Sequence, residues 1–381
     1  MQLGMIGLGK MGANMTRRMG RDGHDIVAHD VSAETVDKLA AELDNITPAH
    51  NLAEVIASLA TPRVIWLMVP HQYVDDSIDA LLSAGLAAGD LVVDGGNSNY
   101  NDTIRRTKWV ESEGLYYIGT GVSGGEEGAR TGPSIMPGGS PAAWEHVKPI
   151  FQAIAAKTDD GEPCCDWVGR GGAGHFVKMV HNGIEYGDMQ MICETYQMMK
   201  EGLGMSNDEM FDAFARWNEG VLDSYLVEIT RDILGYRDEN GEATLDYILD
   251  TAGQKGTGKW TGIAALEAGQ PLTAIAEAVF ARCLSAIKEE RVAASKILTG
   301  PEMNFEGDKA SFINDLEQAL YVSEALPQTG RVMVKDEDLC VHCSLCAERC
   351  PTGAWDMQKS TVLIPYAVDE ASDADAKTSV A

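Results

Sequence analysis

A short stretch in the middle of the chain carries an amine, an imidazole, an amide and a carboxyl group at helical spacing. If residues 172–190 form a helix, Lys178, His181, Asn182 and Glu185 stand at positions i, i+3, i+4 and i+7. Such residues share one face of a helix. A solvated face would more often repeat Glu and Lys, and glycines inside a helix usually mark the close approach of another group. The alternative is a surface helix on which a lysine and a glutamate face the same way by coincidence.

These groups suit an oxidation that is coupled to loss of carbon dioxide. In that chemistry a base removes a hydroxyl proton as hydride leaves the carbon, and an acid later protonates the enediol that decarboxylation leaves. Lys178 could be the base if burial beside other cations favours its neutral form. Glu185 could be the acid, and Asn182 could orient substrate oxygens. The predicted catalytic residues are therefore Lys178, Glu185 and Asn182.

A glycine-rich turn near the start of the chain predicts a dinucleotide site. The motif GLGKMG lies between an apolar strand and a helical stretch. Its glycines allow a tight turn, close approach of a pyrophosphate and close packing of helix on strand, and the helix N-terminus offers free N–H groups to phosphates. The alternative is a glycine-rich turn in an ordinary α/β sheet. The predicted cofactor contacts of this turn are Gly7, Leu8, Gly9, Lys10, Met11 and Gly12.

A carboxylate after the second predicted strand bears on the choice of cofactor. Asp30 can accept hydrogen bonds from both ribose hydroxyls of NAD, whereas it would repel the additional phosphate of NADP. The next residues, Val31 and Ser32, supply no cation for that phosphate. We therefore predict NAD as the preferred cofactor and keep NADP as the alternative. A solvated aspartate in a turn is the other interpretation of Asp30.

The elements that must position these residues follow two patterns. Apolar strands alternate with helical stretches in about the first 130 residues, which predicts a Rossmann-type, doubly wound parallel sheet within residues 1–172. From about His175 onward, long segments rich in Ala, Leu, Glu, Met and Lys predict a mainly helical domain over residues 173–328. The fold class that we expect is thus α/β followed by all-α. The predicted strands are Leu3–Gly7, Asp25–Ala28, Val64–Val69, Leu91–Asp94 and Tyr116–Ile118.

The charge balance argues against several kinds of partner. The chain has 30 Lys and Arg against 58 Asp and Glu, a formal net charge of −28. Nucleic acids are recognised by clustered cations, so we expect no nucleic-acid partner. We also expect no membrane association, because no apolar run approaches the roughly 20 residues of a membrane span. Met1 leads directly into an apolar strand without a signal peptide, so we predict a cytoplasmic location.

Four of the eight cysteines cluster near the C-terminal end, which predicts a metal site in a reducing compartment. Their CxxCxxCxxxCP spacing is that of bacterial ferredoxins, followed by a small, acidic stretch that we expect to be disordered over residues 366–381. In two-cluster ferredoxins the fourth cysteine of a run serves the other cluster, and here there is one run. Zinc and an empty thiol cluster are therefore the alternatives to a [4Fe–4S] cluster. The predicted ligands, within a ferredoxin-like segment at 329–365, are Cys340, Cys343, Cys346 and Cys350.

The stretch 172–190 resembles the signature helix of the 6-phosphogluconate dehydrogenase family almost residue for residue. The resemblance covers about residues 3–326 and includes the stretches 94–98, 121–129, 132–139, 254–260 and 279–282. It implies oxidative decarboxylation of 6-phospho-D-gluconate to ribulose 5-phosphate and carbon dioxide, with reduction of NAD(P), in the pentose phosphate pathway. Lys178 would be the general base and Glu185 the general acid. NADP-using members typically carry Asn-Arg-Thr where this chain has Asp-Val-Ser at positions 30–32.

The resemblance also implies a set of binding residues. Asn97 would contact both cofactor and substrate, and Ser123 with the backbone of the two following glycines would hold the substrate carboxylate. Lys255 and Arg282 would contact the phosphate, and they are the local cations that an acidic chain needs for an anionic substrate. The implied cofactor contacts include Val69, Pro70 and Asn97. The implied substrate contacts are Asn97, Ser123, Gly124, Gly125, His181, Asn182, Tyr186, Lys255 and Arg282.

The chain departs from the family pattern after about residue 321. Long members continue the helical domain and end in a tail that gives an Arg and a His to the phosphate of a neighbouring subunit. This chain turns to the cysteine run instead, so we expect a C-terminally shortened helical domain, and we still predict a homodimer. Two alternative functions are a related β-hydroxyacid dehydrogenase that acts on an unphosphorylated acid, and a nucleotide-binding redox module whose iron–sulfur tail transfers electrons. Loss of Lys255 and Arg282 would favour the first, but both are present.

Overall fold

The computed structural model describes residues 1–158, 160–300 and 305–324. In this part of the chain the residues form two compact units, 1–179 and 180–324. The predicted cysteine segment 329–365 and the predicted disordered stretch 366–381 lie outside the described residues. A helix long and apolar enough to cross a membrane does not occur among the residues that are described.

The first unit is built on one seven-stranded sheet. Its strands follow the order β3-β2-β1-β4-β5-β6-β7, and β1 to β6 run parallel. This confirms the predicted Rossmann-type sheet, to which the antiparallel strand β7 adds an edge. The strands are β1 (Gln2–Ile6), β2 (Asp25–His29), β3 (Ile46–Pro48), β4 (Val64–Leu67), β5 (Leu91–Asp94), β6 (Tyr116–Ser123) and β7 (Ser134–Gly139).

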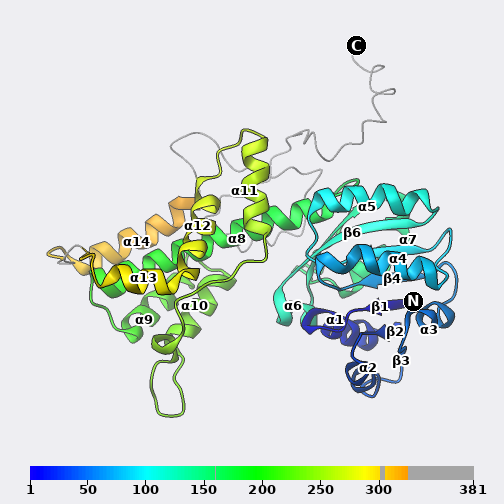
Figure 1. Ribbon diagram of the computed structural model, residues 1–381. Coiled ribbons are helices and arrows are strands. Elements are labelled where there is room, and N and C mark those ends of the chain that lie inside the picture. Colours follow the sequence, from blue (N-terminus) through cyan, green and yellow to red (C-terminus); the bar gives the residue numbers. More distant parts are fainter. Residues whose placement is uncertain (159, 301–304, 325–381) are drawn as a thin grey trace. The chain divides into compact units, whose positions relative to one another are not determined.

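Helices cover both faces of this sheet, as Figure 1 shows. Because side chains alternate along a strand, Met5 and Trp66 pack under one layer of helices, whereas Ile6 and Leu67 pack under the other. The first layer holds α1 (Lys10–Arg21), α2 (Ala33–Ala40) and α7 (Pro141–Ile154). The second holds α3 (Leu52–Ser58), α4 (Val74–Ala84) and α5 (Tyr100–Ser112). The short segments η1 (His71–Tyr73) and α6 (Gly125–Thr131) follow β4 and β6.

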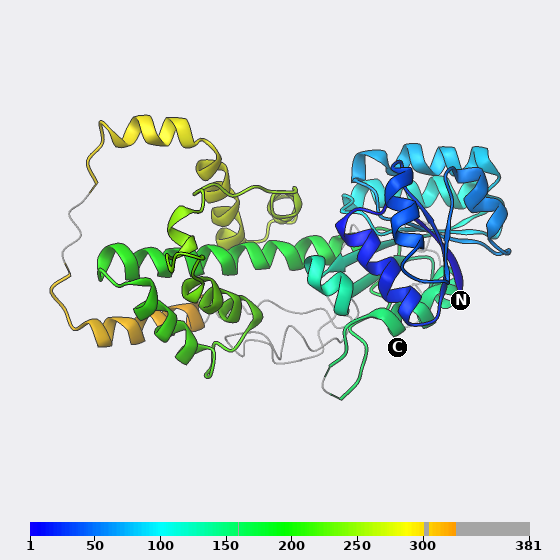
Figure 2. The same cartoon turned by 90° about the horizontal axis from the view of Figure 1, so that it is seen from below.

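The second unit is helical, as predicted. The 25-residue helix α8 (Ala173–Gln197) begins in the first unit and continues through the second. Its C-terminal half lies beside α9, α10 and α14 (Figure 2), and these helices share a core that contains Phe214 and Trp217. The remaining elements are η2 (Met198–Gly202), α9 (Asn207–Trp217), α10 (Tyr225–Gly235), η3 (Thr244–Tyr247), α11 (Thr257–Glu267), α12 (Thr273–Ala286), α13 (Lys288–Ser295) and α14 (Lys309–Glu324).

Candidate functional site

The glycine-rich turn joins β1 to α1 as expected. Gly7 has φ +94°, a backbone conformation that side-chain-bearing residues rarely adopt. A Cβ atom on Gly12 would lie 1.9 Å from the carbonyl oxygen of Gly7, so only glycine lets α1 approach the turn this closely. Gly9 is the N-cap of α1 and has no side chain to occupy the first N–H groups of the helix. The turn therefore has the form that a pyrophosphate requires.

Asp30 lies next to this turn, at the end of β2. Its Oδ2 accepts a hydrogen bond from the backbone N–H of Leu8 at 2.7 Å, and its Oδ1 accepts one from the N–H of Ser32 at 2.9 Å. Ser32 also caps α2 by accepting from the N–H of Thr35, while Val31 is fully exposed. Each carboxylate oxygen can accept more than one hydrogen bond. The two backbone contacts thus orient Asp30 and leave it able to accept from ribose hydroxyls.

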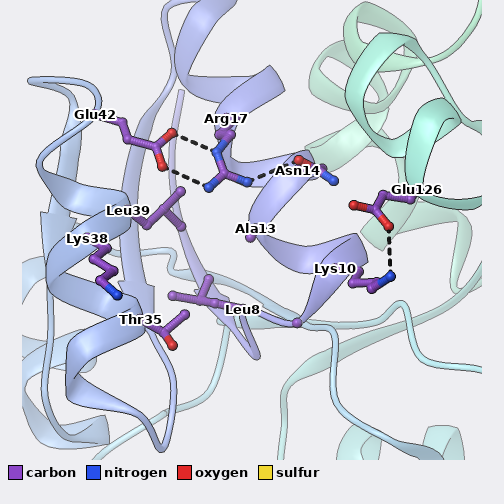
Figure 3. Close-up of a pocket in the computed structure, with 11 residues that line it drawn as sticks. Leu8, Lys10, Ala13, Asn14, Arg17, Thr35, Lys38, Leu39, Glu42 and Glu126 are labelled. Atoms are coloured by element: carbon purple, nitrogen blue, oxygen red, sulfur yellow. Dashed lines mark hydrogen bonds and ion pairs between the residues drawn. The ribbon is translucent and has the colours of Figure 1, made fainter. Parts of the chain in front are cut away.

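A pocket of about 340 Å³ opens beside the turn, between α1, α2 and α6. Two ion pairs lie among its lining residues, Lys10 with Glu126 and Arg17 with Glu42 (Figure 3), and their N–O distances are 3.2 Å and 2.6 Å. A third cation, Lys38, pairs with Glu34 one turn earlier on α2. Carboxylates therefore partner all three cations around this pocket. Its lining is Leu8, Gly9, Lys10, Ala13, Asn14, Arg17, Thr35, Lys38, Leu39, Glu42 and Glu126.

A buried charged network holds the loop that follows β5. The fully buried Asp94 accepts hydrogen bonds at its Oδ2 from Ser98 Oγ at 2.8 Å, from the Tyr117 hydroxyl at 2.9 Å and from Arg106 at 3.3 Å. Burial raises the pKa of Tyr117 well above its ordinary value, so it remains a donor. Burial alone would lower the pKa of Arg106, but the hydrogen bond to Asp75 and the charge of Asp94 raise it. The network keeps charge pairs satisfied next to the loop that carries Asn97.

Lys178 and Asn97 meet in the first unit. The Lys178 Nζ atom donates to Asn97 Oδ1 at 3.1 Å, and both side chains are half-buried. A Cβ atom on Gly121 of β6 would lie 2.3 Å from the Cβ of Lys178, so a larger residue there would displace α8. At the same edge, β6 ends at Ser123, and Gly124 and Gly125 lead into α6. Val69 and Pro70 follow the end of β4.

In the second unit, α8 carries a hydrogen-bonded set around Glu185. The Glu185 Oε2 atom accepts from Asn182 Nδ2 at 2.6 Å, and its Oε1 lies 3.6 Å from His181 Nδ1. The Asn182 Oδ1 atom accepts from the Thr257 hydroxyl at 2.5 Å. Thr257 belongs to the motif at 254–260 but was not among the predicted site residues. Its place directly after Gly256, at the start of α11, was the signal that could have identified it.

The predicted phosphate contacts also lie in the second unit. The Arg282 guanidinium stacks 3.8 Å from the ring centre of the buried Tyr186, and its Nη1 donates to the carbonyl oxygen of Gly253 at 2.7 Å. Such stacking over an aromatic face stabilises and orients a cation. Lys255 is exposed and stands just before Gly256, the N-cap of α11. The Arg282 guanidinium is therefore held in place by the Tyr186 ring and the Gly253 carbonyl group.

The predicted metal ligands Cys340, Cys343, Cys346 and Cys350 lie outside the described residues. Within residues 1–158, 160–300 and 305–324, no group of three or more His, Cys, Asp or Glu side chains could hold a metal ion. The cysteines of this part of the chain are Cys164, Cys165, Cys193 and Cys283, and no disulfide joins any two of them.

Sequence models of known protein families match almost the whole chain. The sequence model of the NAD binding domain of 6-phosphogluconate dehydrogenase matches residues 2–169, and that of the 6-phosphogluconate dehydrogenase C-terminal domain matches residues 174–330. A model of a 4Fe-4S binding domain matches residues 333–356.

Individual relatives agree with these matches. The decarboxylating 6-phosphogluconate dehydrogenase of Schizosaccharomyces pombe is 53% identical over 337 residues, which cover 88% of this chain and 68% of the relative. That of Haemophilus influenzae is 56% identical over 328 residues, covering 85% and 68%. The Plasmodium falciparum 6-phosphogluconate dehydrogenase, solved alone, with its cofactor NADP+ and with its substrate 6-phosphogluconate, superposes with a TM-score of 0.79 at 38% identity, covering 84% of this chain and 70% of that one. The resemblance drawn from the motifs is confirmed, and the chain belongs to the family of decarboxylating 6-phosphogluconate dehydrogenases.

Proposed function

We propose that this chain oxidises and decarboxylates 6-phospho-D-gluconate to ribulose 5-phosphate and carbon dioxide while NAD(P) is reduced. Membership of the family supports the reaction. The observation that carries it is the placement of Lys178, whose amine meets Asn97 in the loop after β5. Glu185 follows seven residues later on the same helix, in a hydrogen bond with Asn182. Residues seven apart lie on the same side of a helix, two turns from each other.

In the first step Lys178 acts as the general base. Its neutral amine takes the proton of the substrate hydroxyl at the β-carbon, and the C–H bond at that carbon breaks with loss of a hydride. When bound, the oxidised nicotinamide ring accepts this hydride. Asn97 keeps the amine in place by accepting a hydrogen bond from it. The product of this step is a β-keto acid.

In the second step the β-keto acid loses its carboxylate as carbon dioxide. The electron pair of the broken C–C bond forms an enediol, whose oxygen receives the proton that Lys178 carries. Glu185 then protonates the carbon that lost the carboxylate while Lys178 takes the proton of the enediol hydroxyl, which gives the ketose. Asn182 orients the Glu185 carboxyl group by donating a hydrogen bond to its Oε2, and His181 Nδ1 lies 3.6 Å from its Oε1. Before the next cycle Lys178 releases this proton to water and Glu185 takes one up, so that the amine is neutral and the carboxyl group is protonated again.

The binding residues divide between the two ends of the substrate. Ser123 and the backbone N–H groups of Gly124 and Gly125 hold the carboxylate, while His181, Asn182 and Tyr186 contact the hydroxyl groups of the carbon chain. Lys255 and Arg282 bind the phosphate as a point charge and a planar fork. The stacking of Arg282 on Tyr186 supports this assignment because it presents an ordered cation.

NAD is the cofactor that we propose as preferred. The glycine turn accommodates the pyrophosphate, and the oriented carboxylate of Asp30 accepts from the ribose hydroxyls. A phosphate on the same ribose would meet this negative charge, and the exposed Val31 offers no cation to offset it. The contacts assigned to the cofactor are those of residues 7–12 and 30–32, with Val69, Pro70 and Asn97 at the neighbouring strand ends.

The reaction is tested by following reduced nicotinamide at 340 nm and released carbon dioxide with 6-phosphogluconate as substrate. Lys178→Met should lower kcat by about 10²–10⁴-fold, the range for loss of a general base. Lys178→Arg should not restore it, because a guanidinium does not give up its proton at neutral pH. Lys296→Met, at an exposed position on α13's C-terminal end, is the matched control and should keep full activity.

Two outcomes would replace this function by an alternative. Turnover of unphosphorylated β-hydroxy acids in preference to 6-phosphogluconate would favour a related β-hydroxyacid dehydrogenase. Cofactor binding without turnover of either substrate, by well-folded protein, would leave only the nucleotide-binding redox module.

We also propose a homodimer. Large apolar side chains are exposed along the helices of the second unit, including Leu266 on α11 and Phe280 and Leu284 on α12, with exposed fractions of 82%, 68% and 58%. Phe280 and Leu284 are four residues apart and so share one face of α12, and exposed apolar patches of this kind mark interaction sites. A second copy of the chain is the partner that the family resemblance favours.

The cysteine segment supports a separate binding proposal. The spacing of Cys340, Cys343, Cys346 and Cys350 and the match of residues 333–356 to a 4Fe-4S binding domain favour an iron–sulfur cluster in a cytoplasmic protein. No step of the dehydrogenase reaction passes through it. Iron and acid-labile sulfide in anaerobically purified protein, with visible absorbance, would support the cluster. Stoichiometric zinc, or protein without metal, would contradict it.

A further inference from the structure

His175 is a buried residue of α8 that the proposed reaction does not use. It lies one turn before Lys178, and only 1% of its surface is exposed. Its Nε2 atom is 3.1 Å from the carbonyl oxygen of Gly96, and its Nδ1 atom is 2.7 Å from the hydroxyl of Thr103 on α5. The imidazole thus joins three segments: α8, α5 and the loop after β5.

The chemistry of the partners assigns the protons of this ring. A carbonyl oxygen can only accept, so Nε2 carries the hydrogen and donates it to Gly96. In the neutral ring Nδ1 then accepts from Thr103. Burial lowers the pKa of His175, which agrees with a neutral imidazole. His175 is therefore a directional donor toward the Gly96 carbonyl.

The backbone of Gly96 is anchored on both sides. Its N–H donates to Asp94 Oδ1 at 3.1 Å, and its carbonyl oxygen accepts from His175. On the other side of Asn97, the hydroxyl of Ser98 donates to Asp94 Oδ2 at 2.8 Å. Without such anchors a loop that begins with two glycines would retain much conformational freedom. Asn97 is thus placed between two residues that are both tied to the buried network.

Helix α8 contacts this loop at two successive points. His175 and Lys178 are three residues apart, so their side chains lie on the same side of α8, one turn from each other. The first holds the backbone of Gly96, and the second donates to the side chain of Asn97. Helix α8 thus contacts both the backbone of Gly96 and the side chain of the next residue, Asn97.

We propose that His175 is a positioning residue for the reaction: its Nε2–H holds Gly96 so that Asn97 Oδ1 meets the Lys178 amine. This inference rests on the proposed role of Lys178 as general base. A catalytic amine that loses its orientation by about 1 Å can lose on the order of 10²-fold in rate. His175 itself touches neither substrate nor cofactor in this assignment.

Two amide substitutions separate the contacts of the ring. The side-chain nitrogen of His175→Gln reaches the position of Nε2 and can still donate to Gly96, whereas the amide of His175→Asn reaches only the position of Nδ1 and the Thr103 side. We expect His175→Asn to lower kcat by on the order of 10²-fold with a much smaller change in KM. The kcat of His175→Gln should stay within about threefold of that of the unsubstituted enzyme, which is a smaller effect than the loss of one hydrogen bond.

Thr103→Val and Thr103→Ser provide a second test that leaves the imidazole in place. Valine removes the hydroxyl group that contacts Nδ1 of His175, so kcat should fall. Serine keeps this hydroxyl group, so kcat should not change. Melting temperature and cofactor affinity of each variant report on folding. Equal kcat values for His175→Asn and His175→Gln, or for Thr103→Val and Thr103→Ser, in folded protein would overturn the positioning role. Failure of the unsubstituted enzyme to turn over 6-phosphogluconate would instead overturn the proposed function, so the two failures are distinguishable.

Discussion

The carboxylate of Asp30 accepts a hydrogen bond from the backbone N–H of Leu8 across 2.7 Å, which ties the end of β2 to the glycine turn after β1. The residues are 22 positions apart in the chain. The contact leaves the negative charge of Asp30 beside the turn that is assigned to the pyrophosphate. Cofactor choice can therefore be tested at this position.

The double substitution Asp30→Asn with Val31→Arg should shift the preference from NAD toward NADP. It removes a carboxylate that repels the additional phosphate and adds a cation at an exposed position. A hydrogen bond to a charged group contributes about 1.5–3 kcal/mol, so the ratio of kcat/KM for NAD to that for NADP should fall by at least about tenfold. Initial rates with both cofactors measure this ratio. An unsubstituted enzyme that already favours NADP would show that Asp30 does not select NAD.

Glu185→Gln should impair the protonation of the enediol and leave the hydride transfer unaffected. The amide keeps an oxygen that can accept from Asn182, but it cannot deliver a proton to carbon. Steady-state kcat should fall by about 10²–10⁴-fold, while a rapid first turnover of reduced nicotinamide persists in stopped-flow measurements. Glu194→Gln, on the same helix and bonded to Gln190, is the control. Loss of the rapid first turnover would place Glu185 before hydride transfer instead.

The buried His175 should make folding stability depend on pH. Its folded-state pKa is lowered by burial from the ordinary value of 6.5, so the unfolded chain binds a proton first as the pH falls. The contribution of the neutral His175 to the free energy of unfolding is fully present above about pH 6.5. It is lost as the pH falls through the lower pKa of the folded state, and the free energy of unfolding then changes by at most about 1.4 kcal/mol per pH unit.

Urea unfolding of the unsubstituted protein and of His175→Gln between pH 8 and pH 5 isolates this contribution, since glutamine does not titrate. The difference in unfolding free energy between the two proteins should shrink below about pH 6.5. A difference that stays constant over this range would mean that His175 is not shielded from water.

Phe280→Glu should weaken the proposed homodimer without unfolding the chain. The ring is 68% exposed on α12, so few intramolecular contacts are lost, whereas a charge at an apolar interface core is unfavourable. Sedimentation equilibrium should show a shift from dimer to monomer at micromolar concentration. Glu277→Gln, on the same helix, changes a charge without adding one to an apolar position and should leave the assembly intact. A monomeric unsubstituted protein would contradict the proposal.

Local patterns allowed much of the fold to be predicted. Strands β1, β2, β4, β5 and β6 were expected from buried apolar runs, and α8 was expected from its periodicity. Two strands were missed. β3 has only three residues, and β7 contains Pro137 and two glycines, which are disfavoured inside strands and typical of loops. Because β7 lies at the end of the strand order, a proline there interrupts no central ladder.

The sequence by itself determined which chemical groups the chain carries and which of them share an element. The glycine turn and the polar stripe of α8 depend on neighbours within a few residues, and helix and turn geometry follow from that local order.

Only the tertiary structure decided which of those groups meet. Lys178 contacts Asn97 across 81 residues of chain, and Asn182 contacts Thr257 across 75. Contacts at such separations are set by how the sheet and helices pack, and no local pattern encodes them. His175 is the clearest case. Its spacing from Lys178 on α8 is visible in the sequence, but its partner is the backbone carbonyl oxygen of Gly96. Every residue type carries such a carbonyl group, so the sequence does not mark this partner.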